Sequence, residues 1–387
     1  MVVAGGSYMQ TSGPSASLQE SRLAYLDVFK GIAIIVVCMG HMITYGSGEP
    51  EAASAYSLSE LLYTGLLMFI VVSGYFHKVG RSLKENLVRR LLPMLAIIIV
   101  GTVVLTLIMY VYLLALGYDL SGCDVWSDIA NAIIGRQSFV KAPGTPEVLG
   151  PYDVTFQFYY IQALIVGYAI FYPIVDRVVI DAKRTLAAIL VLMGITMVYV
   201  EFIDIQLPFY IQLGPMVAAF LLMGAYMRTK DFFDTIKDWY HDKRYWLFFL
   251  ACLAISLTLT YYFPTRKGFC YTIFGYYGGW SVITFTIISV TGGMVLLMLC
   301  AWIAKLGPIG KVMESCGRNC LYVFVLHVFV GCLIIAPFYP LTGEVWFPIT
   351  DEWVSILVAV ATIAIIMVVF GPVKDHIVSY RNHGGSR

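Results

Sequence analysis

Ten apolar runs of about 20 residues each dominate this sequence, and they restrict its fold more than any other feature. They lie at roughly 27–45, 57–79, 90–117, 153–175, 184–203, 207–227, 245–263, 280–304, 319–338 and 353–372. A run of that length crosses the hydrocarbon core of a bilayer as a helix. The composition agrees, because 59% of the residues are hydrophobic and only 13% are charged, about half the charge of a soluble domain. We therefore predict an all-α integral membrane protein, a bundle of about ten transmembrane helices.

Lysine and arginine are distributed unevenly between the predicted loops. Of the 25 basic residues, all but Arg136, Lys141, Arg266 and Lys267 fall on the side that holds both chain ends. Cytoplasmic loops collect basic residues, so this pattern predicts that both termini are cytoplasmic and that the chain resides in the inner, cytoplasmic membrane. The net charge of +1 gives no reason to expect nucleic acid as a partner.

The domain organisation is predicted to be simple. Residues 1–21 are rich in Gly, Ser and Ala and show no signal-peptide pattern, so we expect them to be disordered. Residues 22–373 form one membrane domain, because no loop has a core pattern of its own, and residues 374–387 form a cytoplasmic tail. Cys123 and Cys270 both fall in outer loops, where a disulfide and two separate thiols both fit the sequence. No residues have the spacing of metal ligands, and we assign no metal.

The first span contains two ionisable residues, Lys30 and His41. In a helix, eleven residues place them about 20° apart around the axis and about 16 Å apart along it, so one face carries both. Ionisable groups at membrane depth are costly and mark functional sites. His41 suits a general base for a hydroxyl, and Lys30 suits an anionic group that arrives from the cytoplasm. The structural alternative is a lysine that reaches the interface beside Asp27 and a histidine bonded to a neighbouring helix.

Two further groups carry chemistry. Arg89 and Arg90 precede Pro93 at the inner end of the third span, where proline suits a first helical turn and arginine forks suit phosphate oxygens. Ordinary positive-inside anchoring explains the same pattern. His327 lies near the middle of the ninth span. It is a candidate to orient His41 or to line the substrate path, and a core histidine with satisfied hydrogen bonds is the alternative.

These residues resemble the acyltransferase-3 family of membrane-bound acyltransferases. Lys30-x10-His41 is similar to its Arg/Lys-x10-His signature. Four other segments follow in the family's order: Met68–Tyr75, Arg89-Arg90-Leu-Leu-Pro93, Phe156–Leu164 and Cys320-Leu-Tyr-Val-Phe-Val-Leu-His327. The family often spaces its helix-3 arginines as Arg-x-Arg, whereas here they are adjacent.

The resemblance implies acyl transfer from cytoplasmic acyl-CoA, most often acetyl-CoA, to a hydroxyl of a glycan or glycolipid on the outer side. In this interpretation His41 is catalytic together with Lys30, and Arg89, Arg90 and Lys30 bind the acyl-CoA. His327, Ser73 and Asp27 support the active site. Acyl-CoA is a co-substrate, and no permanently bound cofactor is expected. The remaining partners are the acceptor, which belongs to the cell envelope, and the lipid bilayer.

The acceptor side is indicated only by aromatic residues in and beside the outer loops, among them Tyr276, Tyr277 and Trp280. Sugars stack on such rings, but an interfacial aromatic belt gives the same pattern. A transporter or flippase for a cell-surface glycan or its lipid-linked precursor is the alternative function. A membrane scaffold would need neither Lys30 nor His41.

Overall fold

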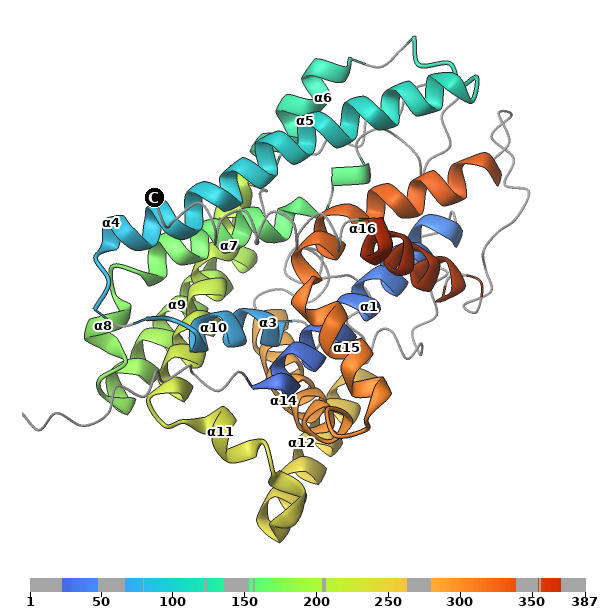
Figure 1. Ribbon diagram of the computed structural model, residues 1–387. Helices are drawn as coiled ribbons and strands as arrows, with labels where there is room; N and C mark the ends of the chain where they lie inside the picture. Colours follow the sequence, from blue (N-terminus) through green and yellow to red (C-terminus); the bar gives the residue numbers. More distant parts are fainter. Residues whose placement is uncertain are drawn as a thin grey trace, which may run out of the picture.

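The computed structural model describes residues 23–47, 67–78, 80–121, 124–135, 153–155, 157–203, 207–262, 280–338, 354 and 356–369. Within these ranges every regular element is helical (Figure 1). The longer helices are α1 (Ala24–Ser47), α5 (Leu92–Ala115), α7 (Phe158–Phe171), α9 (Ala182–Phe202), α10 (Gly214–Arg228), α12 (Lys243–Tyr262), α14 (Trp280–Ile303), α16 (Cys320–Ile335) and the helix Ile356–Val369. The shorter ones are α3 (Met68–Tyr75), α4 (Leu83–Asn86), α6 (Val125–Ile134), α8 (Val175–Val178), α11 (Phe232–Ile236), α15 (Pro308–Arg318) and the single turns η2 (Leu87–Leu91), η3 (Asp153–Thr155), η4 (Pro208–Leu213), η5 (Trp239–His241) and η6 (Ala336–Phe338).

The helices identify a multi-pass membrane protein. Six of those described are long and apolar enough to cross a bilayer, or up to seven if α15 and α16, which are bent by 80° relative to each other, form one span. Each of the ten predicted ranges contains a helix, whereas the number of ten crossings and the side of the termini stay predictions. Segments 1–21 and 374–387, Cys123 and Cys270 lie outside the described residues.

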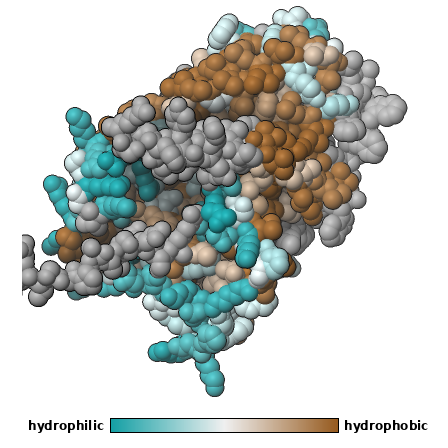
Figure 2. Space-filling view, in the orientation of Figure 1, coloured by the Kyte–Doolittle hydropathy of each residue, from teal (hydrophilic) through white to brown (hydrophobic). Residues whose placement is uncertain are grey.

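The long helices differ in how much of their surface is covered. α5, α9 and α12 expose most of their apolar side chains, whereas α1, α10 and α14 are largely buried. Figure 2 shows the exposed apolar surface along α5 and polar surface at the end of the bundle near α8. Apolar chains on that scale are stable only against lipid or another apolar surface. The peripheral helices therefore face lipid or another apolar surface, and the inner helices form the core.

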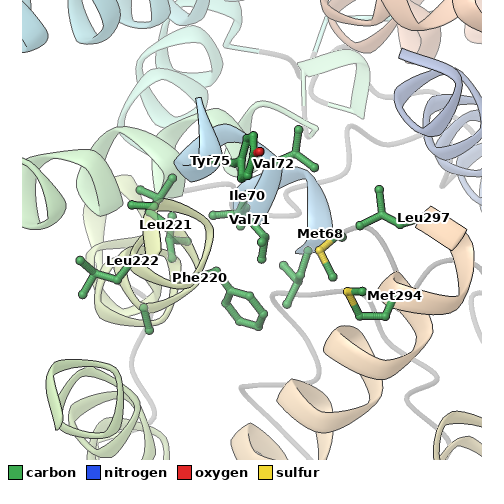
Figure 3. Packing of buried hydrophobic residues seen from close by; sticks show 14 of the residues in the cluster. Met68, Ile70, Val71, Val72, Tyr75, Phe220, Leu221, Leu222, Met294 and Leu297 are labelled. Atoms are coloured by element: carbon green, nitrogen blue, oxygen red, sulfur yellow. The ribbon is translucent and has the colours of Figure 1, made fainter. Parts of the chain in front are cut away.

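α10 is the centre of this core, and glycine makes its closest contact possible. A Cβ on Gly224 would lie 1.8 Å from the carbonyl oxygen of Val71, and one on Gly74 would lie 2.1 Å from that of Leu221. The two glycines therefore allow the backbones of α3 and α10 to touch, as small residues do in membrane helices. Figure 3 shows side chains of α3, α10 and α14 packed around this contact.

α1 meets α15 through a second glycine pair. A Cβ on Gly317 would lie 1.7 Å from the carbonyl oxygen of Asp27, and one on Gly31 would lie 2.1 Å from that of Met313. The chain then turns by 80° at Asn319 and enters α16. This turn brings α16 back along the second half of α1.

The third predicted span begins earlier than the sequence suggested. The helix starts at Leu83, where the Ser82 hydroxyl accepts a hydrogen bond from the Glu85 N–H at 3.2 Å, and it runs without interruption to Ala115. Pro93 therefore lies inside a helix, where it cannot donate to the carbonyl of Arg89 and its ring would crowd that carbonyl. The turn η2 adapts by a five-residue spacing, in which the Leu92 N–H bonds the Leu87 carbonyl. Such π-turns occur often at functional sites.

Candidate active site

His41 and His327 lie together in the core, one on α1 and one on α16. Their ring centres are 5.1 Å apart, and the ring planes form an angle of 51°. Gly331, one turn beyond His327, makes this approach possible, because a Cβ there would lie 2.4 Å from the Met42 sulfur. The sequence placed both histidines in spans, and the fold brings them into contact.

Their surroundings are apolar. The core around the pair is formed by the second half of α1, α5, the start of α7, α16 and the helix Ile356–Val369. His327 is completely buried, whereas His41 retains partial accessibility. His41 is therefore the histidine that a substrate can reach.

The ring of His327 is held in one orientation by its own helix. Its Nδ1 lies 3.1 Å from the carbonyl oxygen of Val323 and 2.8 Å from that of Phe324. Its Nε2 is buried and has no hydrogen-bond partner among the described residues. Because carbonyl oxygens only accept hydrogen bonds, the proton of a neutral His327 belongs on Nδ1, which leaves Nε2 as an acceptor.

Lys30 lies at the other end of α1. Its Nζ is 3.2 Å from Oδ1 of the buried Asp27 and 5.7 Å from the centre of the Phe76 ring. The helical rise puts it about 16 Å from His41 along the axis. Asp27 therefore pairs with Lys30 rather than with His41, and both belong to a region separate from the histidine pair.

Three further cations surround the same end of α3. The Arg228 guanidinium lies 5.2 Å from the centre of the Tyr75 ring. Arg81 and Arg90 lie close enough to His77 to influence its charge. We use the name basic end for the four cations and the end of α3 that they surround: Lys30, Arg81, Arg90, Arg228 and residues 75–77.

The two predicted donor-binding arginines point in different directions. Arg90 donates a hydrogen bond to the hydroxyl of Tyr168, and its guanidinium lies 5.2 Å from the centre of that ring. Arg89 is 63% exposed and forms an ion pair with Glu85 at 3.2 Å. The structure therefore places Arg90 inside the basic end and Arg89 on the outer surface of the same helix.

Ser73 lies next to the basic end, where its hydroxyl is close enough to Tyr168 to influence the charge of that phenol. Ser73 and Arg90 thus approach the same tyrosine from two helices. Tyr168 was missed in the sequence, although a tyrosine near the inner end of an apolar span, opposite a basic segment, was the available signal. His77 was missed as well; its Nε2 lies 3.2 Å from Oδ1 of Asp176.

Aromatic side chains connect the basic end to the histidine pair. Tyr160 precedes Tyr168 by eight residues on α7, which is about 12 Å along a helix. The ring of Tyr160 lies 5.6 Å from that of Phe324, which in turn lies 5.9 Å from that of His327. Tyr168 and Tyr160 are about 80° apart around the axis of α7, so adjoining sides of this helix lead from Arg90 to the neighbourhood of His41.

The structure does not place the side chains of the three predicted acceptor contacts. Tyr276 and Tyr277 lie outside the described residues, and Trp280 is the first residue of α14, where only the backbone is described. Within the described ranges, no three His, Cys, Asp or Glu side chains are grouped as metal ligands would be.

Comparison with known proteins confirms the family resemblance. The family model of an acyltransferase domain, acyltransferase-3, matches residues 23–371. The chain therefore belongs to the acyltransferase-3 family, and both ends of the site lie within the matched region. No curated protein and no solved structure matches the chain significantly.

Proposed function

We propose that this protein is a membrane-bound O-acyltransferase that moves a short acyl group, acetyl in the first instance, from acyl-CoA to a hydroxyl of a glycan or glycolipid. The observation that carries this proposal is the arrangement along α1. A cationic group of residues lies at one end of the helix, and His41 with its neighbour His327 lies about 16 Å further along it. The donor would enter from the cytoplasm, and the acceptor would be reached from the outer side.

The basic end suits the phosphates of coenzyme A. Arg90 is held by the neutral hydroxyl of Tyr168, and among the described residues no carboxylate pairs with it, so its positive charge is available to an anion. Guanidinium groups bind phosphate oxygens through paired hydrogen bonds. Arg89, which Glu85 already pairs, is a weaker candidate, and we assign the donor contact to Arg90.

The distance of about 16 Å between Lys30 and His41 along α1 limits what Lys30 can do. A lysine side chain cannot span the distance to His41, so Lys30 is proposed to bind the donor rather than to stabilise charge at the reacting carbonyl. The extended pantetheine arm of coenzyme A would follow α7 between Tyr168 and Tyr160. The nucleotide then stays at the basic end while the thioester reaches His41.

The chemical step is a direct acyl transfer. His41 takes the proton from the acceptor hydroxyl as its oxygen attacks the thioester carbonyl. The new C–O bond forms, the C–S bond breaks, and the coenzyme A thiolate leaves with the proton that His41 returns. The apolar surroundings of the pair limit competing hydrolysis by water. Tyr276, Tyr277 and Trp280 remain proposed acceptor contacts.

The test measures acyl transfer in membranes that contain the protein, using [14C]acetyl-CoA and counting label in envelope glycans. Wild type is expected to incorporate label and His41→Gln is not. Equal incorporation by both would overturn the mechanism. Thermal unfolding of the purified protein with acetyl-CoA, succinyl-CoA and free CoA identifies the donor, because a ligand of the native state raises the midpoint. If no CoA species shifts the midpoint and no label is transferred, the transporter becomes the better interpretation.

A further inference from the structure

The histidine pair contains an unused acceptor. His327 is completely buried, yet its Nε2 has no partner among the described residues. A buried polar atom without a hydrogen bond is costly and is uncommon in a folded core. The Nδ1 contacts to Val323 and Phe324 already hold the ring in place, so packing alone does not require a second nitrogen here. A phenyl or leucine side chain would fill the space without that cost.

The distance to His41 is suitable for a hydrogen bond between the two rings. As the two rings stand they are not hydrogen-bonded to each other, since Nε2 of His327 has no partner among the described residues. A ring nitrogen lies about 1.2 Å from the ring centre, so with centres 5.1 Å apart a rotation of the His41 ring can bring one of its nitrogens within about 3 Å of Nε2, the ordinary hydrogen-bond distance. Since Nδ1 of His327 carries its proton, Nε2 can only accept. Within the pair, the donor is then an N–H of His41.

From this geometry, and resting on the proposed role of His41 as the base, we infer that His327 is a positioning residue: its Nε2 accepts a hydrogen bond from one ring nitrogen of His41 once that ring rotates toward it in the reacting complex. This bond keeps the proton of neutral His41 on the nitrogen that faces His327. The other nitrogen keeps its lone pair and faces the acceptor hydroxyl.

The same bond acts during the reaction. When His41 takes the proton of the hydroxyl, a positive imidazolium forms inside an apolar core, where a charge is stable only if it is hydrogen-bonded. His327 accepts from this imidazolium without itself gaining or losing a proton. A third group that orients the base and stabilises its charged form is the logic of catalytic triads, here with a neutral imidazole in place of a carboxylate.

The test compares three variants of the full-length protein in membranes. His327→Leu removes the acceptor, and His327→Gln offers an amide oxygen in the place of Nε2. His241→Leu is the control, because His241 is an exposed residue of η5, away from both ends of the site. We expect His327→Leu to lower kcat about 100-fold with unchanged KM for donor and acceptor, and His327→Gln to recover most of that loss.

Other results would overturn the inference. Unchanged kcat in His327→Leu contradicts it, and so does an equal loss in the Leu and Gln variants, which would indicate packing. A raised KM for the acceptor with unchanged kcat would place His327 in the substrate path. If His327→Leu does not fold, nitrogen NMR of the [15N]histidine-labelled wild type decides, with His327→Gln used for assignment. The inference requires a proton on Nδ1, and a proton on Nε2 contradicts it. Loss of activity in His41→Gln with full activity in His327→Leu would refute this inference alone and leave the proposed function intact.

Discussion

The two ends of the site are built in opposite ways. At the histidine pair, two rings from α1 and α16 lie in an apolar core with few polar neighbours. At the basic end, cations from several elements surround the end of α3 and rest against aromatic rings. Apolar surroundings suit a chemical step, because charges interact strongly there. An accessible cationic group suits the capture of an anion. Changes at the first end should therefore affect kcat, and changes at the second should affect KM.

The largest effect is expected from His41→Gln. Without a base the acceptor hydroxyl keeps its proton, and kcat should fall about 1,000-fold. The rise of the unfolding midpoint with acetyl-CoA should remain, because the basic end is intact. Rate measurements and thermal titrations on the same preparation check both statements. Loss of the CoA-dependent rise would show that the two ends are not separable.

A glycine packs closely against α1 near each end of the site, but the two glycines contact different kinds of group. A methyl group on Gly317 meets the backbone of α1 at Asp27, whereas one on Gly331 meets the flexible end of Met42. We expect Gly317→Ala to destabilise the fold by about 3 kcal/mol and Gly331→Ala to cost clearly less, since a methionine side chain can move.

Gly194 in the exposed helix α9 is the matched control, because a Cβ there meets nothing within 4 Å. Gly194→Ala should stabilise the protein by about 0.5–1 kcal/mol through helix propensity. Unfolding midpoints in one detergent check the series. Equal midpoints for the Gly317 and Gly331 variants would mean that the contact between α1 and α15 is looser than described.

A comparison of Arg90→Gln with Arg89→Gln tests which of the two arginines binds the donor. Loss of a charge-assisted bond to phosphate should raise KM for acetyl-CoA about 10- to 100-fold, with kcat little changed. Arg89→Gln should change KM less than about twofold, because an exposed ion pair contributes little. Donor titrations at two salt concentrations check this, and the wild-type KM should rise with salt. Equal effects of the two substitutions would contradict the assignment to Arg90.

The smallest effect on stability is expected from the ion pair between Lys305 and Asp238, which lies outside both ends of the site. Lys305 pairs with Asp238 at 2.7 Å, and both side chains are about half exposed. The hydrogen bond from Lys305 lowers the pKa of Asp238. The pair therefore stabilises the fold above the ordinary aspartate pKa, and this contribution is lost as the pH falls through the depressed folded value.

Lys305→Met should cost less than about 1 kcal/mol at neutral pH, and less still in acid, with kcat and KM unchanged. Unfolding midpoints measured at neutral and acidic pH check the stability change. A change in KM would extend the basic end to the loop that precedes α15.

Much of the arrangement was predictable from local rules. Apolar run lengths located a helix in each predicted range, and helical periodicity placed Lys30 and His41 on one face of α1. The signature of these two residues, with the order of the later segments, indicated the family. These features depend on spacing along one chain segment, which the residues themselves specify.

The split between Arg89 and Arg90 was not predictable in this way. Pro93 suits a first helical turn, and this predicted a helix start close to it. The observed start at Leu83 instead puts Pro93 inside the helix, and a π-turn precedes it. That turn sets which arginine faces Tyr168. The role of each arginine therefore depends on where the helix begins and on what it packs against.

The sequence by itself determined the membrane character, the positions of the helices, the family and the distance between Lys30 and His41, because these follow from hydrophobicity and helical geometry. Only the tertiary structure decided that His41 meets His327 and that Arg90 rather than Arg89 enters the basic end. Those contacts require helices remote in sequence to touch. Whether they touch depends on backbone approaches at Gly31, Gly317 and Gly331, and on the 80° turn at Asn319, which no local pattern specifies.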